Sequence, residues 1–139
     1  AMENRRVVFD TNWYISASIN QRSRRRLYSL LLRSDLAIFY SDELVAEYRR
    51  VINRPKFKKY ILAHQYNRFL RLILPRLHHV TIQQPPPVLS RDPSDNYLLA
   101  LSAEAEAGYL VTGDPDLLVL QTVGATRIVT MAQFLEILA

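Results

Sequence analysis

The sequence contains no cysteine and only three glycines, and each shortage excludes a class of site. Without cysteine the chain can form neither disulfide bonds nor thiolate metal sites. A glycine-rich phosphate-binding loop is excluded as well, because Gly113 stands alone after its apolar run. No apolar run approaches the roughly 20 residues that a membrane-spanning helix needs. Together these absences fit a cytoplasmic protein that has no membrane partner.

The length of 139 residues suits one domain with a hydrophobic core. We therefore expect residues 1–139 to form a single domain, with Ala1 ahead of Met2 as an extra residue left from cloning. No signal peptide is expected, because the apolar run after the first arginines is too short. The segment Gln83–Pro87 is expected to be a stiff, extended connector inside this domain.

Acidic residues are scarce in the first half of the chain, and basic residues are scarce in the second. Residues 1–76 hold 16 Lys/Arg and 6 Asp/Glu, whereas residues 77–139 hold 2 and 7. A basic half of this kind favours binding to a polyanion such as nucleic acid. Its densest clusters lie at 22–26, 49–50 and 54–59, and each of them could also be a solvated helix face.

Short apolar runs alternate with helical patterns along the chain. The first run, Val7–Phe9, is apolar on both faces, as in a buried parallel strand. Ser41 or Asp42 can cap the helix after the second run, and Gly108 is expected to end a later helix. The expected strands are 7–9, 37–40, 79–82, 109–112 and 126–129, and the expected helices are 23–34, 43–53, 59–74, 93–107, 115–120 and 130–138. Such alternation predicts a three-layer α/β sandwich with a central parallel sheet.

Carboxylates follow four of the predicted strands. Asp10 ends the first strand, and Glu47 lies in the second turn of the helix after the second strand. Asp95 lies in the first turn of the helix after the third strand. Asp114 follows the fourth strand, with Asp116 two residues further on. Because the carboxyl ends of parallel strands meet at one edge of a sheet, we expect these acids to gather in one crevice.

Gathered carboxylates repel one another, and a divalent cation would remove that repulsion. Mg²⁺ or Mn²⁺ prefers oxygen ligands. Two such ions roughly 4 Å apart can activate water and stabilise the leaving oxygen of a phosphodiester. The basic remainder of the chain would then bind the phosphate backbone. This arrangement predicts a metal-dependent nuclease.

Each acid also has a simpler interpretation. Asp92, Asp95 and Asp114 stand where they could serve only as helix caps. Glu47 could be a partly exposed helix acid. Asp10 is harder to explain in this way, because an acid that ends a buried strand has no evident capping role. The joint placement of the acids favours the metal site over any one of these interpretations.

Five segments of the chain resemble the PIN-domain family. They are VVFDTN at 7–12, SDELVAEY at 41–48, RPKF at 54–57, RDPSDNYLLAL at 91–101 and VTGDPDLL at 111–118. Within that family the chain is similar to the toxin components of bacterial toxin–antitoxin pairs, relatives of VapC-type toxins. The resemblance implies five parallel strands in the order 3-2-1-4-5. It also implies a ribonuclease that depends on one or two Mg²⁺ or Mn²⁺ ions.

The resemblance also implies roles for individual residues and partners. The catalytic and metal-binding quartet falls on Asp10, Glu47, Asp95 and Asp114, with Asp116 as an auxiliary metal ligand. Polar side chains expected to orient these ligands are Thr11, Asn12, Asp92 and Thr112, of which Asp92 could instead be only a cap. The basic clusters noted above, not the resemblance, supply the side chains expected to bind RNA, which are Arg24, Arg25, Arg26, Arg50, Arg54 and Lys56. The implied partners are an RNA substrate, a cognate antitoxin and a second copy of the chain in a homodimer.

Several residues and two other functions stay outside this scheme. Trp13 and Tyr14 replace the family's smaller residues, and they could stack on bases or pack in the core. His78 and His79 are expected at the start of a strand, on the edge opposite the acids, with a structural role. A PIN-fold module that binds an antitoxin or RNA without catalysis is the main alternative. A phosphoacceptor receiver domain would need a lysine where Thr130 stands.

Overall fold

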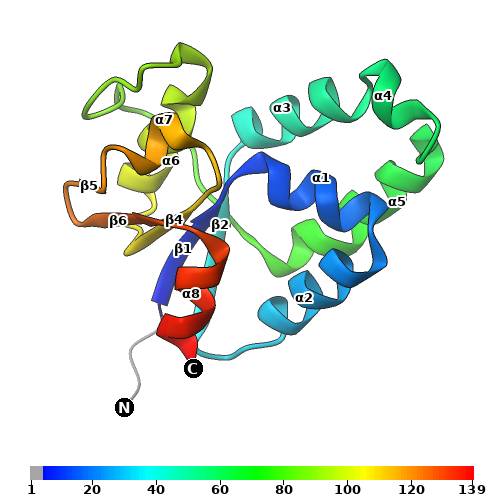
Figure 1. Ribbon diagram of the computed structural model, residues 1–139, viewed down its shortest axis with the longest axis horizontal. Coiled ribbons are helices and arrows are strands. Elements are labelled where there is room, and N and C mark those ends of the chain that lie inside the picture. The colour runs from blue at the N-terminus through cyan, green and yellow to red at the C-terminus, as the bar shows by residue number, and fades with distance from the viewer. Residues whose placement is uncertain (1–4) are drawn as a thin grey trace.

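The computed structural model describes residues 5–139, which form a central sheet covered by helices on both faces (Figure 1). The strands are β1 Arg5–Phe9, β2 Leu36–Tyr40, β3 His78–His79, β4 Tyr109–Val111, β5 Thr122–Val123 and β6 Thr126–Val129. The helices are α1 Thr11–Ile19, α2 Gln21–Leu31, α3 Asp42–Ile52, α4 Pro55–Lys58, α5 Ala63–Ile73, α6 Asn96–Glu104, α7 Pro115–Leu118 and α8 Met131–Leu138, with short 3₁₀ turns η1 Leu74–Arg76 and η2 Pro93–Asp95. The predicted α/β class is therefore confirmed.

The sheet has six strands in the order β3-β2-β1-β4-β6-β5. The strands from β3 to β6 in that order pair in parallel, and they reproduce the predicted order 3-2-1-4-5. A sixth strand that the sequence did not predict, β5, pairs antiparallel with β6 at the edge. Gly124 closes the turn of this hairpin with a φ of +58°, which glycine adopts without steric cost.

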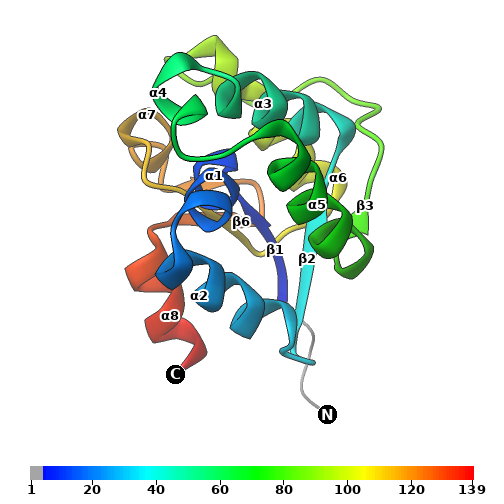
Figure 2. The same cartoon turned by 90° about the vertical axis from the view of Figure 1, so that its right-hand side faces the viewer.

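Strand β1 lies at the centre of the fold and supplies its innermost residues. Val7, Val8 and Phe9 are completely buried. Helices α1, α2 and α5 lie on one side of the sheet, and α6 lies on the other (Figures 1 and 2). A strand covered on both faces has no polar side, which explains why the buried part of β1, Val7–Phe9, is apolar at every position. The core thereby holds the carboxyl end of β1, where Asp10 begins, in one place.

Two helices that the sequence did not predict, α1 and α4, each precede a predicted helix. The predicted helix at 23–34 is preceded by α1, and Asn20 separates α1 from α2 with extended backbone. The Asn20 side chain then caps α2 by accepting a hydrogen bond from Ser23 N at 3.1 Å. The predicted helix at 59–74 forms as α5, which begins later than expected, and α4 precedes it as a separate short helix. The ends of these helices are therefore set by local capping and turns, which the apolar periodicity of the sequence did not reveal.

Two further boundaries differ from the prediction. The third strand is His78–His79 rather than 79–82. Gly108 does not end α6, because the chain leaves this helix earlier, with Glu106 in the left-handed conformation at a φ of +49°. The Gly108 amide instead donates to Arg6 O at 2.8 Å, which brings the chain into the sheet. Across residues 5–139, every helix is too short or too polar to span a bilayer.

Candidate metal centre

Asp10 is buried at the junction between β1 and α1. It is the N-cap of α1, and its Oδ1 accepts a hydrogen bond from Asn12 N at 3.2 Å. Its Oδ2 accepts from Thr112 Oγ1 at 2.6 Å. The expectation that Asp10 has no capping role is therefore wrong. The two hydrogen bonds hold both carboxylate oxygens, so the orientation of the Asp10 side chain is set by its neighbours.

Thr112 connects Asp10 to the acid that follows the adjacent strand. Its hydroxyl accepts from Asp114 N at 3.0 Å while it donates to Asp10. Asp114 is in turn the N-cap of α7, and its Oδ1 accepts from Asp116 N at 2.9 Å. Because β1 and β4 are parallel neighbours in the sheet, these hydrogen bonds link Asp10 and Asp114 at the carboxyl ends of the two strands.

Four aspartates converge next to this junction. The residues are Asp92, Asp95, Asp114 and Asp116, and each offers a carboxylate oxygen within 4.8 Å of the others. Asp92 therefore lies inside the cluster, although the sequence left it as a cap or an orienting residue. It also caps η2, because its Oδ1 accepts from Ser94 N at 3.0 Å and from Ser94 Oγ at 2.8 Å. These hydrogen bonds lower the pKa of Asp92.

Asp95 is the acid of this cluster whose charged form is disfavoured most strongly by its surroundings. Its Oδ2 is buried, and no hydrogen-bond partner for it lies among residues 5–139. Burial raises the pKa of Asp95 to about 8, and the neighbouring Asp114, Asp92 and Asp10 carboxylates act in the same direction. A buried carboxylate oxygen without a partner, set among like charges, is a position that a cation would stabilise.

Asp10 and Glu47 extend the negative region beyond the four aspartates. Burial raises the pKa of Asp10, and the charges of Asp114 and Glu47 add to that effect. The hydrogen bonds from Thr112 and Asn12 oppose it. Within the described chain, the tight 4.8 Å group includes neither Asp10 nor Glu47. The acids therefore form one electrostatic region with an inner group and two outlying members.

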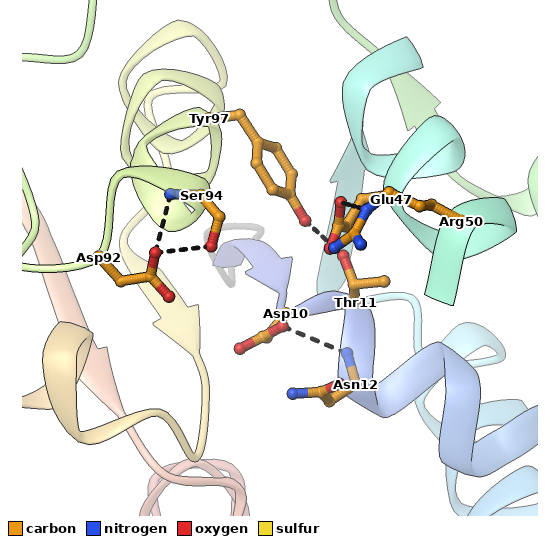
Figure 3. A network of polar contacts seen from close by, with 8 residues as sticks. All are labelled: Asp10, Thr11, Asn12, Glu47, Arg50, Asp92, Ser94 and Tyr97. Atoms are coloured by element: carbon orange, nitrogen blue, oxygen red, sulfur yellow. Dashed lines mark hydrogen bonds and ion pairs between the residues drawn. The ribbon is translucent and has the colours of Figure 1, made fainter. Parts of the chain in front are cut away.

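Glu47 reaches this region from α3 and is ion-paired to a neighbour on the same helix. Its two carboxylate oxygens accept from Arg50 Nη2 at 2.6 Å and from Arg50 Nε at 3.0 Å (Figure 3). Arg50 was predicted to bind RNA, whereas in the structure its guanidinium is held by an expected metal ligand. The two side chains lie close to Tyr97 and Thr11 (Figure 3).

Tyr97 is a site residue that sequence reasoning missed. It projects from α6 toward Asp10, and its hydroxyl forms a hydrogen bond with Thr11 Oγ1 (Figure 3). Burial raises the pKa of the Tyr97 phenol, and the nearby charges of Asp10 and Glu47 raise it further, so the phenol stays protonated. The sequence spacing did not reveal it, because residues two apart on a helix, such as Asp95 and Tyr97, point to different faces.

The predicted RNA-binding residues fall into different environments. The Nε of Arg24 donates to Ala17 O at 3.0 Å, so its side chain is partly engaged by α1. Arg25 and Arg26 are exposed on α2. Arg54 and Lys56 are exposed at α4, which lies beyond the end of α3 farthest from the sheet (Figure 1). Their role in binding RNA stays a prediction.

The unusual aromatic pair and the histidines are also placed. Tyr14 is completely buried and its ring centroid lies 6.4 Å from that of Phe9, while Trp13 is half-buried against the core. The prediction that His78 and His79 lie on the edge opposite the acids is wrong. His79 pairs with Tyr40, the last residue of β2, so these histidines lie at the carboxyl end of the sheet. His79 Nε2 contacts Asp42 Oδ1 at 2.9 Å, which ties β3 to the start of α3.

The donor set fits a hard divalent cation. All the candidate ligands are carboxylates, and Mg²⁺ and Mn²⁺ prefer oxygen over nitrogen or sulfur. The partnerless oxygen of Asp95 supplies an independent sign that a positive group belongs in the cluster. The region can therefore hold one or more cations at the point where the strands β1 and β4 end.

Comparison with known proteins agrees with this architecture. The family model described as PIN domain matches residues 6–116. Among solved structures, the chain is similar to one in the crystal structure of VapBC2 from Rickettsia felis bound to a DNA fragment from their promoter. That match has a TM-score of 0.57 and 15% sequence identity, and it covers 88% of this chain and 96% of the other. No curated protein matches the sequence. At this identity the structural likeness shows a shared fold.

Proposed function

Because the chain belongs to the PIN-domain family, we propose that it is a metal-dependent endoribonuclease that hydrolyses RNA phosphodiesters. The observation that carries this proposal is the convergence of carboxylates beside the junction of β1 and β4. These acids lie in a chain whose formal net charge is +5. A local negative site within a basic protein favours cations at the site and a polyanion over the surface around it.

The residues that would hold Mg²⁺ or Mn²⁺ are the acids of this region. They are Asp10, Glu47, Asp95, Asp114 and Asp116, joined by Asp92 because of its place in the cluster. When bound, one or two cations would neutralise these charges and help to activate water for attack on a phosphodiester. Asp95 would lose its raised pKa on binding the cation, because the positive charge replaces its repulsive surroundings.

The chain's own polar residues have defined tasks in this reaction. Thr112 fixes the Asp10 carboxylate through the 2.6 Å hydrogen bond, so that the acid keeps one orientation. Tyr97 and Thr11 present hydroxyl groups next to the acids, and a neutral hydroxyl can donate to a phosphate oxygen. Exposed basic residues such as Arg25 and Arg54 would bind the RNA backbone without reading its sequence.

We further propose that the protein is a toxin restrained by a cognate antitoxin. The fold likeness to a VapBC2 chain supports this role. An exposed groove supports it too, because apolar and basic side chains of α2 and α5 line a volume of about 520 Å³ between them. Tyr28 and Leu72 belong to this groove and to a second hollow beside Leu32, which is 72% exposed. A hollow surface that exposes large apolar side chains such as Leu72 and Leu32 favours a protein partner.

Replacement of Asp10 tests the nuclease function directly. Asn keeps the helix cap and the shape of the side chain but removes the charge, so Asp10→Asn should fold normally. We expect Mn²⁺-dependent cleavage of a mixed RNA pool to fall by more than about 100-fold. Glu136→Gln, which removes an exposed acid of α8, is the matched control and should keep full activity. Undiminished cleavage by Asp10→Asn would contradict the proposal, whereas a wild type that binds RNA without cleaving it would support the non-catalytic alternative.

A further inference from the structure

Two arginines lie on opposite sides of the candidate metal centre, and each is ion-paired to one of its acids. On α3, Arg50 contacts both carboxylate oxygens of Glu47, at 2.6 and 3.0 Å. On the side of α7, Arg91 Nη2 lies 3.0 Å from Asp116 Oδ1. Helices α3 and α7 stand on either side of the end of β1 (Figure 1). Each arginine is therefore paired with an expected metal ligand, Arg50 with Glu47 and Arg91 with Asp116.

We propose that Arg50 and Arg91 bind RNA phosphates on the two sides of the metal centre, and that Glu47 and Asp116 mask them until metal is bound. This inference rests on the metal-dependent nuclease function proposed above. Arginine is suited to the task because its planar guanidinium can bind a phosphate through two parallel hydrogen bonds. The sequence predicted no role for Arg91, and only the structure shows its ion pair with Asp116.

The exposure of the two pairs allows the exchange. The Arg50 and Arg91 side chains are 57% and 63% exposed, so their ion pairs add little to stability and are easily replaced. A carboxylate gains more from a divalent cation, and a guanidinium gains more from a phosphate. When Glu47 and Asp116 turn to the cation, each arginine is left with its charge facing solvent. Metal and RNA should therefore bind cooperatively, each raising the affinity for the other.

A purely structural role for the arginines predicts the opposite effect on metal binding. Arg91 Nη2 also lies 3.4 Å from Pro115 O, so the side chain could serve as a clamp between the loop before η2 and α7. If the arginines act as clamps, removing them would misplace Glu47 or Asp116 and weaken metal binding. If they act as masks, removing them would release a ligand and take away a repelling positive charge. The sign of the change in metal affinity separates the two roles.

The first measurement is calorimetric titration of Mn²⁺ into the metal-free full chain without RNA. We expect Arg50→Ala and Arg91→Ala to bind Mn²⁺ about threefold to tenfold more tightly than the wild type. Arg71→Ala removes an exposed arginine from the last turn of α5 and is the matched control, with unchanged affinity. Weaker Mn²⁺ binding by the Arg50 and Arg91 variants would overturn the proposal.

The second measurement is the salt dependence of RNA binding, followed by fluorescence anisotropy with a labelled single-stranded phosphorothioate RNA that resists cleavage. In Mn²⁺, each alanine variant should lower the slope of log affinity against log salt by about 0.7, the value for one lost phosphate contact. In EDTA the same variants should leave the slope unchanged, because the arginines are masked. Arg50→Lys and Arg91→Lys keep the charge and should restore the slope, although not the full affinity.

The outcomes of the salt experiment are distinct from those of the cleavage assay. If the variants lower the slope of log RNA affinity against log salt equally in EDTA and in Mn²⁺, the arginines bind RNA without metal, and the proposed masking by Glu47 and Asp116 is wrong. If the Arg50 and Arg91 variants show the same salt slope as Arg71→Ala in both Mn²⁺ and EDTA, the two arginines do not contact phosphates, and the proposal is wrong even if the wild type cleaves RNA. Conversely, the predicted slopes in a wild type that cleaves nothing would support this inference and remove the nuclease function.

Discussion

Asp10 combines two roles that the sequence presented as alternatives. It caps α1, and it is also a buried carboxylate beside the acid cluster. Its hydrogen bonds to Asn12 N and Thr112 Oγ1 favour the charged form, whereas burial disfavours it. A capped carboxylate is therefore both held in position and left electrostatically unsatisfied, which suits a metal ligand.

The raised pKa of Asp95 predicts how stability depends on pH. A carboxyl whose pKa is higher in the folded chain contributes stability at low pH, and that contribution is lost as pH rises from the ordinary 3.8 toward about 8. Asp95→Asn removes the titrating group, so the variant should gain thermal stability relative to the wild type over this range in EDTA. Excess Mn²⁺ should raise the unfolding temperature of the wild type near pH 8 and reduce the difference.

Thermal unfolding of both proteins at a series of pH values checks this prediction. Glu136→Gln, which changes an exposed acid of α8 outside the candidate metal centre, is again the control. A difference between Asp95→Asn and wild type that stays constant from pH 4 to about pH 8 would show that Asp95 titrates normally.

Helix starts and acid positions coincide at the level of the secondary-structure elements. Asp10, Asp92 and Asp114 cap α1, η2 and α7, and each stands at a turn that leads into a helix. A helix N-terminus stabilises a nearby negative charge, so capping helps to offset the repulsion between the acids. The capping and metal-binding interpretations of these residues are therefore compatible, because a carboxylate oxygen that accepts one hydrogen bond keeps a further lone pair for a cation.

The cap of α3 allows a test at this scale. Ser41 is completely buried, and its Oγ accepts from Leu44 N at 3.3 Å at the start of the helix that carries Glu47. Ser41→Ala should lower the free energy of unfolding by about 1 kcal/mol, because the Leu44 amide loses its partner. Urea unfolding measures the loss, with the exposed Ser34→Ala as control. An unchanged midpoint for Ser41→Ala would show that this cap does not stabilise α3.

At the scale of the whole molecule, the acid site and the groove between α2 and α5 occupy different parts of the surface. Residues of α2 and α5 line the groove, whereas the acids gather where β1 and β4 end. Helix α2 lies away from that end of the sheet (Figures 1 and 2). Partner binding and metal binding should therefore be separable by mutation.

Leu72→Asp tests this separation. Leu72 is 53% exposed in the groove, so the change should not disturb the core. We expect it to abolish co-purification with the antitoxin proposed above and to leave RNA cleavage intact, because a charge buried against apolar side chains is poorly tolerated. Val119→Asp, at an exposed apolar residue after α7, is the control and should keep the partner. Undisturbed co-purification with Leu72→Asp would place the partner elsewhere.

The sequence by itself determined the parts of this protein that depend on local interactions. The apolar run of β1, the Ser41 cap and the bounds of β6 all follow from neighbouring residues, and the structure confirms them. The strand order was inferred from the family resemblance, and it is also confirmed. The gathering of acids was predicted because parallel strands must end at the same edge.

Only the tertiary structure decided which side chains meet. Asp92 joins the aspartate cluster, Tyr97 reaches Thr11, and Arg50 and Arg91 pair with acids at the site. These contacts depend on rotamers and on how the helices cross the sheet, neither of which a spacing in the sequence specifies. The edge strand β5 was missed for a related reason, because two residues carry too little periodicity to predict pairing.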